Sequence, residues 1–257
     1  MKLKLKHSLA CVIIDTYPNK ELAKLATNQM LKVCDPKEVY VLSSENFLDG
    51  AKFFKIRSLN SMRAYESIVL SMLPAIIEED FALLYQWDGF VLNENAFDSR
   101  FLNYDYIGAP WFPSNEDPRV GNGGFCLRSR KLLDFLLVNT LSPDHSINDG
   151  ANEDVRICTI YRKEAEDYGV RFAPVEVASQ FAFETRPVAG TFGFHGMFNF
   201  PLIFPESFLI EHLDLIINRT RNFNMWRDFL GRCLSVGMNG LAGAVQRHFE
   251  DNRFNPN

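Results

Sequence analysis

The sequence lacks the glycine-rich phosphate motifs found in many nucleotide-binding proteins. Neither GxGxxG nor GxxxxGK[ST] occurs in its 257 residues, which excludes a dinucleotide fingerprint and a P-loop. No apolar run approaches the roughly 20 residues that a membrane-spanning helix needs. Leu9–Ile14 is too short for a signal segment or a span and runs into Asp15. A phosphate ligand would have to be held in another way, for example by a metal ion on a carboxylate.

Cysteines are also few, and acidic residues outnumber basic ones. The chain has five cysteines, an odd number, and no CxxC, which argues against a disulfide framework and a zinc site. Reduced, buried thiols in a cytoplasmic protein are the simpler explanation. The formal net charge is -5, which argues against a general nucleic-acid-binding protein, since that needs a positive surface. A local basic patch around a phosphate group remains compatible with this charge.

The first ninety residues alternate between strand and helix patterns. Strands are expected at Ser8–Ile14, Glu38–Leu42, Lys52–Ile56 and Phe81–Gln86, with helices starting near Pro18 and Ser61. Such alternation predicts an α/β fold with a mainly parallel sheet flanked by helices. Open α/β sheets bind ligands at the carboxyl ends of their strands. Thr16 and Tyr17, after the first strand, and Arg57, after the third, are therefore candidate donor-binding residues.

The second half of the chain differs from the first in composition and pattern. It is aromatic and turn-rich to about residue 204, with strand-like segments expected within Phe172–Phe183, and it is helical from Pro205. We therefore predict a main domain over 1–204 and a C-terminal helical segment over 205–257 packed on it. The apolar faces of that segment leave open a dimer contact, a membrane-surface contact or docking on another enzyme.

Asp88 follows an apolar strand and precedes Gly89. Hairpin turns use Asp-Gly routinely, so Asp88 can be an ordinary turn residue. It can also bind a donor, because it lies at the carboxyl end of a strand that looks central in the sheet. The absence of other phosphate motifs favours the donor-binding role, with Gln86 beside it.

Three later segments carry further candidates. The glycines after Asn122 would let the backbone approach a ligand closely, although a tight turn would also use them. Glu153 and Asp154 open a helix, where acidic residues either complement the helix dipole or act as a general base near a ligand. His195 lies between two glycines and would suit Mn²⁺ or Mg²⁺ together with a carboxylate; a lone histidine is more often structural. Arg128 is expected to be solvated.

Five segments in this order resemble a bacterial and fungal domain family of unassigned function, the DUF5672 type. They are Gln86–Asp88, Tyr104–Trp111, Val120–Arg128, Asn152–Asp154 and Phe192–His195. The resemblance covers roughly residues 39–195, and YDYIGAPW and VGNGGFCLR are its specific stretches. That family is associated with glycosyltransferases and surface polysaccharide synthesis, including lipopolysaccharide. The order of the segments is also similar to that of GT-A glycosyltransferases, which implies a Rossmann-like mixed sheet.

The resemblance implies an enzyme that moves a sugar from a nucleotide-sugar donor to a hydroxyl of a glycan or glycolipid acceptor. The roles it implies are donor binding by Gln86 and Asp88, acceptor binding by Trp111, Asn122, Gly123 and Gly124, catalysis by Asp154 and Glu153, and a divalent cation (Mn²⁺ or Mg²⁺) on Asp88 and His195. Gln86 departs from the GT-A pattern, because it stands where the first Asp of Asp-x-Asp would be.

Two other classes of function fit the same residues. A GT-A-like module could bind a sugar or an assembly partner without turnover, and Gln86 supports this alternative. A nucleotidyltransferase is less favoured, because no basic glycine-rich loop lies near the first strand. The expected location is the cytoplasm, with peripheral contact at the inner face of the membrane through the C-terminal helices as an alternative. The sequence leaves the donor sugar, the acceptor and the stereochemistry of transfer open.

Overall fold

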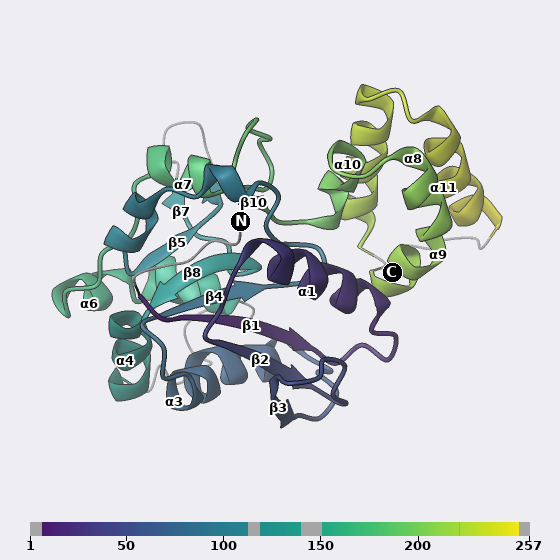
Figure 1. The fold of residues 1–257 in the computed structure, drawn as a ribbon. Coiled ribbons are helices and arrows are strands. Elements are labelled where there is room, and N and C mark those ends of the chain that lie inside the picture. Colours follow the sequence, from purple (N-terminus) through teal and green to yellow (C-terminus); the bar gives the residue numbers. More distant parts are fainter. Residues whose placement is uncertain (1–6, 113–118, 140–150, 221, 252–257) are drawn as a thin grey trace. The chain divides into compact units, whose positions relative to one another are not determined.

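The computed structural model describes residues 7–112, 119–139, 151–220 and 222–251 (Figure 1). The chain divides into two compact units, residues 1–195 and 196–257. The sequence places this division a few residues later, between 204 and 205. The packing of the second unit on the first stays a prediction.

The first unit is built on a six-stranded sheet in the order β3-β2-β1-β4-β8-β5 (Figure 1). β1 (Leu9–Asp15) pairs in parallel with β2 (Glu38–Ser43) and with β4 (Phe81–Tyr85). β3 (Lys52–Lys55) pairs in parallel with β2. All four predicted strands of the first ninety residues are therefore present, and their parallel pairing is confirmed.

The other two strands make the sheet mixed. β8 (Phe125–Ser129) is antiparallel to both of its neighbours, β4 and β5 (Tyr106–Gly108). β4 and β8 are buried along their whole length. Continuous apolar runs are what strands need when helices or loops cover both faces of a sheet, so the mixed, mainly parallel α/β fold follows from the sequence pattern.

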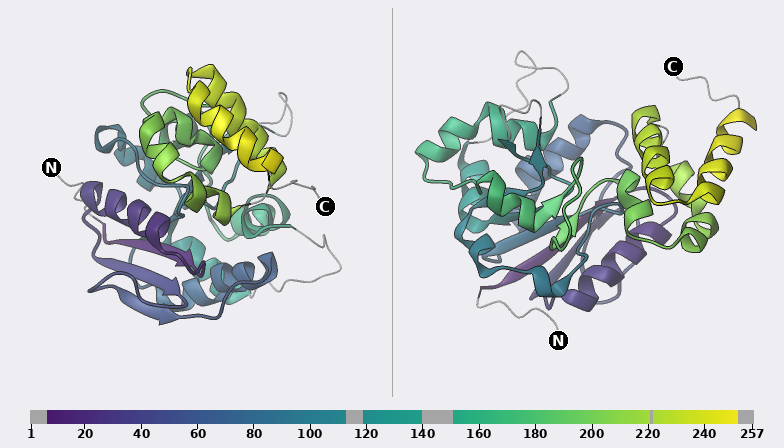
Figure 2. Two further views of the ribbon diagram at one scale, coloured as in Figure 1. Left: turned by 90° about the vertical axis from the view of Figure 1, so that its right-hand side faces the viewer. Right: turned by 90° about the horizontal axis from the view of Figure 1, so that it is seen from above.

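Two crossovers place helices on opposite faces of the sheet (Figures 1 and 2). α1 (Glu21–Val33) links β1 to β2, and the next crossover links β3 to β4 through α2 (Met62–Ser67), a π-helical turn (Ile68–Met72) and α3 (Leu73–Ile76). The crossovers run in opposite directions along the sheet. Because such connections are right-handed, their helices cover opposite faces. The predicted cap of α2 is confirmed, since the Ser61 hydroxyl accepts the Ala64 N–H at 3.2 Å.

The strand-like segments expected within 172–183 are present but short. Phe172 forms an isolated parallel bridge with Tyr106, and β9 (Ala182–Phe183) is a strand. Between them lies a helix that the sequence pattern did not predict, α7 (Val175–Phe181). Ala178 and Phe181, three positions apart, are both buried, so helical rather than strand spacing brings the apolar side chains into the core.

The remaining elements of the first unit are short. The helices are two 3₁₀ segments (Glu94–Ala96 and Ser99–Asn103), α4 (Arg130–Asn139), α5 (Glu153–Val155), a π-helical turn (Arg156–Ile160) and α6 (Arg162–Asp167). The strands are β6 (Pro110–Trp111), paired with β7 (Arg119–Val120), and β10 (Gly193–Phe194), paired with β9. The helix expected from Asn152 to Gly169 is therefore present but segmented, and it ends at Gly169, whose φ is +97°. The loops expected at 114–119 and 142–150 lie, except for Arg119, outside the described residues.

The second unit is helical, as predicted (green to yellow in Figure 2). A 3₁₀ segment (Met197–Leu202) precedes α8 (Glu206–Glu211), α9 (Leu213–Arg219), α10 (Phe223–Ser235) and α11 (Asn239–Asp251). Trp226 packs against Phe229 and Phe249, at ring distances of 5.1 and 5.4 Å, and so joins α10 to α11. In the part of the chain that the structure describes, no helix is long and apolar enough to cross a membrane.

Substitution of Phe125 tests how much the aromatic core next to β8 contributes to stability. The buried Phe125 ring stacks on Phe181 at 5.2 Å and contacts Phe192 at 5.9 Å. Phe125→Ala should lower the free energy of unfolding by about 3–5 kcal/mol, because it leaves a cavity among packed rings. Val138→Ala, at a side chain that is 70% exposed on α4, should change it by less than about 0.5 kcal/mol. Urea denaturation of both variants checks this, and equal midpoints would contradict it.

Candidate functional site

The candidate residues meet beyond the carboxyl ends of β1 and β4. From β1 the chain continues to β2 on one side, whereas β4 lies on the other side. This reversal marks the switch point at which open α/β sheets bind ligands. Directly after β4, Gln86 and Gly89 exchange backbone hydrogen bonds of 2.9 and 3.1 Å around Trp87 and Asp88. Asp88 is therefore a turn residue, and it lies at the ligand-binding edge of the sheet with only 3% of its surface exposed.

His195 connects this turn to two other segments. Its Nε2 lies 3.2 Å from Gln86 Oε1 and 3.9 Å from Asp88 Oδ1. Its Nδ1 lies 2.9 Å from Glu184 Oε1 and 2.9 Å from Asn122 Nδ2. Four polar side chains from three separate parts of the chain thus surround one imidazole.

The charge of this imidazole depends on its neighbours. Burial by itself lowers the pKa of His195. The hydrogen bond to Glu184 and the nearby charge of Asp88 raise the pKa by more than burial lowers it, so that it reaches about 9. At neutral pH the ring is therefore protonated, donating from Nδ1 to Glu184 and from Nε2 to Gln86. His195 acts as the cation of this cluster when no metal is bound.

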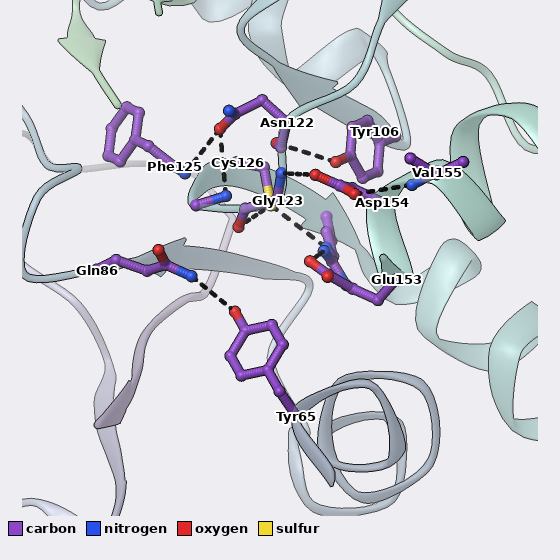
Figure 3. Close-up of polar contacts among 12 residues, drawn as sticks. Tyr65, Gln86, Tyr106, Asn122, Gly123, Phe125, Cys126, Glu153, Asp154 and Val155 are labelled. Atoms are coloured by element: carbon purple, nitrogen blue, oxygen red, sulfur yellow. Dashed lines mark hydrogen bonds and ion pairs between the residues drawn. The ribbon is translucent and has the colours of Figure 1, made fainter. Parts of the chain in front are cut away.

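Glu184 and Tyr65 are two members of the cluster that the sequence analysis missed. Glu184 follows β9 as His195 follows β10, and these strands pair in parallel with Phe183 opposite Phe194. The register therefore sets the two side chains next to each other. The Tyr65 hydroxyl accepts the Gln86 Nε2–H at 3.0 Å (Figure 3). A carboxylate directly after Ala-Phe was the available signal for Glu184, but two-residue strands give no periodic pattern.

The glycines after Asn122 face side chains of the cluster. Asn122 has a φ of +61° and its Oδ1 accepts the N–H groups of Gly124 and Phe125 at 3.2 and 3.3 Å (Figure 3). A Cβ on Gly123 would lie 2.0 Å from a Glu153 carboxylate oxygen. A Cβ on Gly124 would lie 2.0 Å from His195 Nε2. Glycine is thus required here for packing, while the acceptor-binding role of these residues stays a prediction.

Glu153 and Asp154 both lie against Gly123 of this loop, but in different environments. Asp154 is partly exposed, and its carboxylate accepts the N–H groups of Gly123 and Val155 at 2.9 and 2.8 Å (Figure 3). Glu153 is only 3% exposed. Burial and the charge of Asp154 raise the pKa of Glu153 to about 7, against the opposing effect of Arg128. This pair therefore combines a partly exposed carboxylate that accepts two backbone N–H groups with a buried one that titrates near neutral pH.

The prediction that Arg128 is solvated is wrong, because its side chain is fully buried. Its Nη2 lies 3.5 Å from Glu153 Oε1, and its Nε donates to Cys126 Sγ at 3.3 Å. Its guanidinium carbon lies 5.5 Å from the centre of the Tyr106 ring. Both faces of β8 are covered, so the side chain remains inside and supplies the positive charge next to Glu153.

The donor candidates lie at different distances from the cluster. Thr16 and Tyr17 follow β1 at the switch point; the Thr16 hydroxyl accepts the Leu59 N–H, and the Tyr17 N–H donates to Asp15, both at 2.9 Å. Arg57 is exposed and follows β3, three strand spacings or roughly 14 Å from β4. The structure thus brings Thr16 and Tyr17 to the same edge as Gln86 but places Arg57 well away from it.

A divalent cation is compatible with the donor atoms near Asp88. Among the described residues, no group of three or more His, Cys, Asp or Glu side chains is arranged to hold a metal. Asp88 Oδ1, His195 Nε2 and Gln86 Oε1 nevertheless converge, and oxygen and imidazole donors suit Mn²⁺ or Mg²⁺. The residues fit such an ion if the Gln86 amide oxygen serves as a third ligand and His195 gives up its Nε2 proton.

The fold and the site define a mixed α/β domain with a buried polar cluster at the switch point of its sheet. Residues 50–195 match the model of a family described as protein of unknown function (DUF5672). The chain belongs to this family, which confirms the resemblance of its motifs. No curated protein matches the chain.

The chain is similar, at low identity, to solved glycosyltransferases. It is similar to the apo form of the glycosyltransferase GlyE of Streptococcus pneumoniae TIGR4, at 13% identity and a TM-score of 0.46, over 73% of this chain and 54% of GlyE. It is also similar to a glycosyltransferase involved in the glycosylation of the major capsid of PBCV-1, at 12% identity and a TM-score of 0.49, over 73% of this chain and 92% of the other. The chain thus spans about half the length of the GlyE chain. At these identities and scores the likeness carries no inference about activity.

The protonation of His195 should make stability depend on pH. The pKa of about 9 in the folded protein lies above the ordinary value of 6.5, so proton binding favours the folded state. This contribution is complete below pH 6.5 and is lost as the pH rises through about 9. In metal-free buffer, the free energy of unfolding should fall by up to roughly 3 kcal/mol between pH 6.5 and 9.5.

Urea titrations of three proteins across this range check the effect. Glu184→Gln should flatten the fall, because it removes the carboxylate that holds the Nδ1 proton. Glu94→Gln, at an exposed position outside the cluster, should leave the fall unchanged. The same slope in the wild type and Glu184→Gln would show that Glu184 does not set the charge of His195.

Proposed function

We propose that the protein is a glycosyltransferase that moves a sugar from a nucleotide-sugar donor to a hydroxyl of a glycan or glycolipid acceptor. The observation that carries this proposal is the convergence of Gln86, Asp88, Asp154 and His195 on the switch point of the sheet. Their order along the chain is the one that resembles GT-A glycosyltransferases. Surface polysaccharide synthesis, including lipopolysaccharide, is the setting that the family resemblance suggests.

The donor would lie across the carboxyl ends of β1 and β4. Thr16 and Tyr17 would contact its nucleotide, and Arg57 could reach only the far end of an extended donor. Asp88 and His195 would hold Mn²⁺ or Mg²⁺, with Gln86 beside them. When bound, such a cation would neutralise the negative charge that develops on the diphosphate leaving group.

In the transfer step the acceptor hydroxyl oxygen forms a bond to the anomeric carbon of the donor sugar. The bond from that carbon to the diphosphate oxygen breaks, and the nucleoside diphosphate leaves with the electron pair. The hydroxyl proton passes to Glu153 or Asp154. Glu153, with a pKa of about 7, is matched to a general base at neutral pH, whereas Asp154 is the more accessible of the two.

One-step attack of this kind inverts the anomeric centre. Retention without a protein base is the alternative, and the anomeric configuration of the product, read by NMR, decides between them.

A non-catalytic module that binds a sugar or an assembly partner is the second candidate. The specific observation in its favour is that both carboxylates also have structural partners. Asp154 accepts two backbone N–H groups, and Glu153 is buried 3.5 Å from Arg128. Groups with such partners can fix a loop without moving a proton.

A donor panel separates the two candidates. Purified protein is incubated with UDP-, GDP- and CMP-sugars in Mn²⁺ or Mg²⁺, with and without glycan acceptors, and nucleotide release is followed. A glycosyltransferase should release nucleotide from one class of donor and release it faster with an acceptor. Saturable donor binding with no release under any condition would favour the module and overturn the proposed activity.

Substitution of the two carboxylates tests their part in the reaction. Asp154→Asn and Glu153→Gln each remove a possible proton acceptor with little change in shape. The variant that lacks the true base should lose about 10²–10⁴-fold in turnover, while circular dichroism shows the fold unchanged. Glu164→Gln, exposed on α6, is the control. Losses below about threefold in both variants would remove both residues from the chemistry.

A further inference from the structure

A pocket with an aromatic wall lies in the second half of the first unit. Its volume is about 590 Å³, and its lining includes Trp111, Phe112, Arg119, Val155, Thr185 and Arg186. Such a volume lies within the range of small-ligand pockets, which combine apolar walls with a few polar groups. This pocket is separate from the donor edge formed by β1 and β4, so it can take a second substrate.

The pocket adjoins the polar cluster through two chain segments. Val155 directly follows Asp154, the partly exposed carboxylate proposed to face the acceptor. Thr185 directly follows Glu184, whose carboxylate lies 2.9 Å from His195 Nδ1. A ligand in the pocket would therefore have one end beside the proposed reaction centre.

The charge of the pocket differs from that of the chain as a whole. Among its described lining residues, the charged ones are both arginines, Arg119 and Arg186. A second pocket, of about 370 Å³, shares Arg119 and Thr159 with it, and the one further charged residue described in its lining is Arg162. The whole chain carries a formal net charge of -5. Positive side chains are thus concentrated along these neighbouring pockets.

The aromatic residues fix the shape of the wall and orient one arginine. The Trp111 ring lies so close to Gly121 that a Cβ there would meet it at 2.4 Å. The Arg186 guanidinium carbon lies 3.9 Å from the centre of the Phe112 ring. This stacking uses the face of the guanidinium, whereas its N–H donors lie at the edge, in the geometry that recognises a planar carboxylate or a phosphate.

We propose that this pocket binds the acceptor and selects one that is anionic. The acceptor would be a glycan whose sugar at or next to the accepting unit carries a carboxylate or a phosphate group. Arg119 and Arg186 would bind the anion, and Trp111 would cover a sugar ring. That the bound glycan is an acceptor rests on the proposed glycosyltransferase function. The binding of an anionic sugar can be measured without turnover.

Two pairs of probes test the selectivity. Trigalacturonate is compared with its fully methyl-esterified and therefore neutral form, and mannose 6-phosphate is compared with neutral mannose. Binding to the wild-type protein is measured by calorimetry and saturation-transfer NMR in low salt. Trigalacturonate should bind at least about tenfold more tightly than its ester, since hydrogen bonds from an arginine to a charged carboxylate are stronger than those to a neutral ester. The preference should shrink in high salt.

The two anionic probes distinguish the sources of the charge. Preference for trigalacturonate over its ester points to an acidic polysaccharide, and preference for mannose 6-phosphate over mannose points to a phosphorylated or lipid-phosphate-linked glycan. Either preference supports an anion site. Equal affinity for charged and neutral members of both pairs would overturn the proposal.

A pair of double variants assigns the binding to the pocket. Arg119→Gln/Arg186→Gln should weaken binding of the preferred anionic probe about tenfold and leave the neutral probe unchanged. Arg227→Gln/Arg247→Gln, on exposed positions of α10 and α11, removes the same charge elsewhere and should have no effect. If both double variants lose the same affinity for the anionic probe, the preference comes from the overall charge of the protein, and the assignment to this pocket is overturned.

Donor assays on the same samples separate failure of this inference from failure of the proposed function. Nucleotide-sugar release without any preference for anionic sugars would refute the anionic acceptor and leave the glycosyltransferase standing. Arginine-dependent binding of anionic sugars without release from any donor would refute turnover and leave an anionic-glycan site in a binding module.

Discussion

The missing Cβ atoms of Gly123 and Gly124 are the constraint on which the site depends. Glu153 lies where a side chain on Gly123 would be, and His195 lies where one on Gly124 would be, in each case at 2.0 Å from the hypothetical Cβ. Any other residue would push apart the helix start that carries Glu153 or the strand end that carries His195. The two glycines thus bring segments thirty or more residues apart along the chain to contact distance, through ordinary packing.

Buried ionisable groups surround this contact. Arg128, Glu153 and Asp88 are at most 3% exposed, and the His195 side chain is 18% exposed. Removing such groups from water is costly unless neighbours compensate their charge. Here the compensation comes from within the cluster: Glu184 and Asp88 favour the charged form of His195, and Arg128 opposes the neutralisation of Glu153. Groups with shifted pKa values are more frequent at functional sites than elsewhere, which agrees with the proposed reaction centre.

Two regions adjoin the cluster and, in the proposed reaction, would take different ligands. One is formed by the carboxyl ends of β1 and β4, where the order of strands reverses and a nucleotide would lie. The other is the pocket of Trp111, Arg119 and Arg186. Asp154 links the cluster to this pocket, since its carboxylate accepts the Gly123 N–H and the next residue along the chain lines the pocket. In the proposed reaction, an acceptor hydroxyl and a donor diphosphate would reach one centre from these two regions.

The sequence by itself determined the strands β1 to β4, their parallel pairing, and the positions of Thr16 and Asp88 just beyond strand ends, because apolar periodicity reports which side chains are buried and where an element stops. It also marked Asn122, Glu153 and His195 through local glycines and a helix start. Only the tertiary structure decided that Glu184 lies beside His195, that Tyr65 bonds Gln86 and that Arg128 is buried beside Glu153. These contacts join segments that are distant along the chain. They follow from the register of β9 and β10 and from packing on both faces of β8. Strands of two residues are too short to show a periodic pattern, and a single buried arginine shows none either.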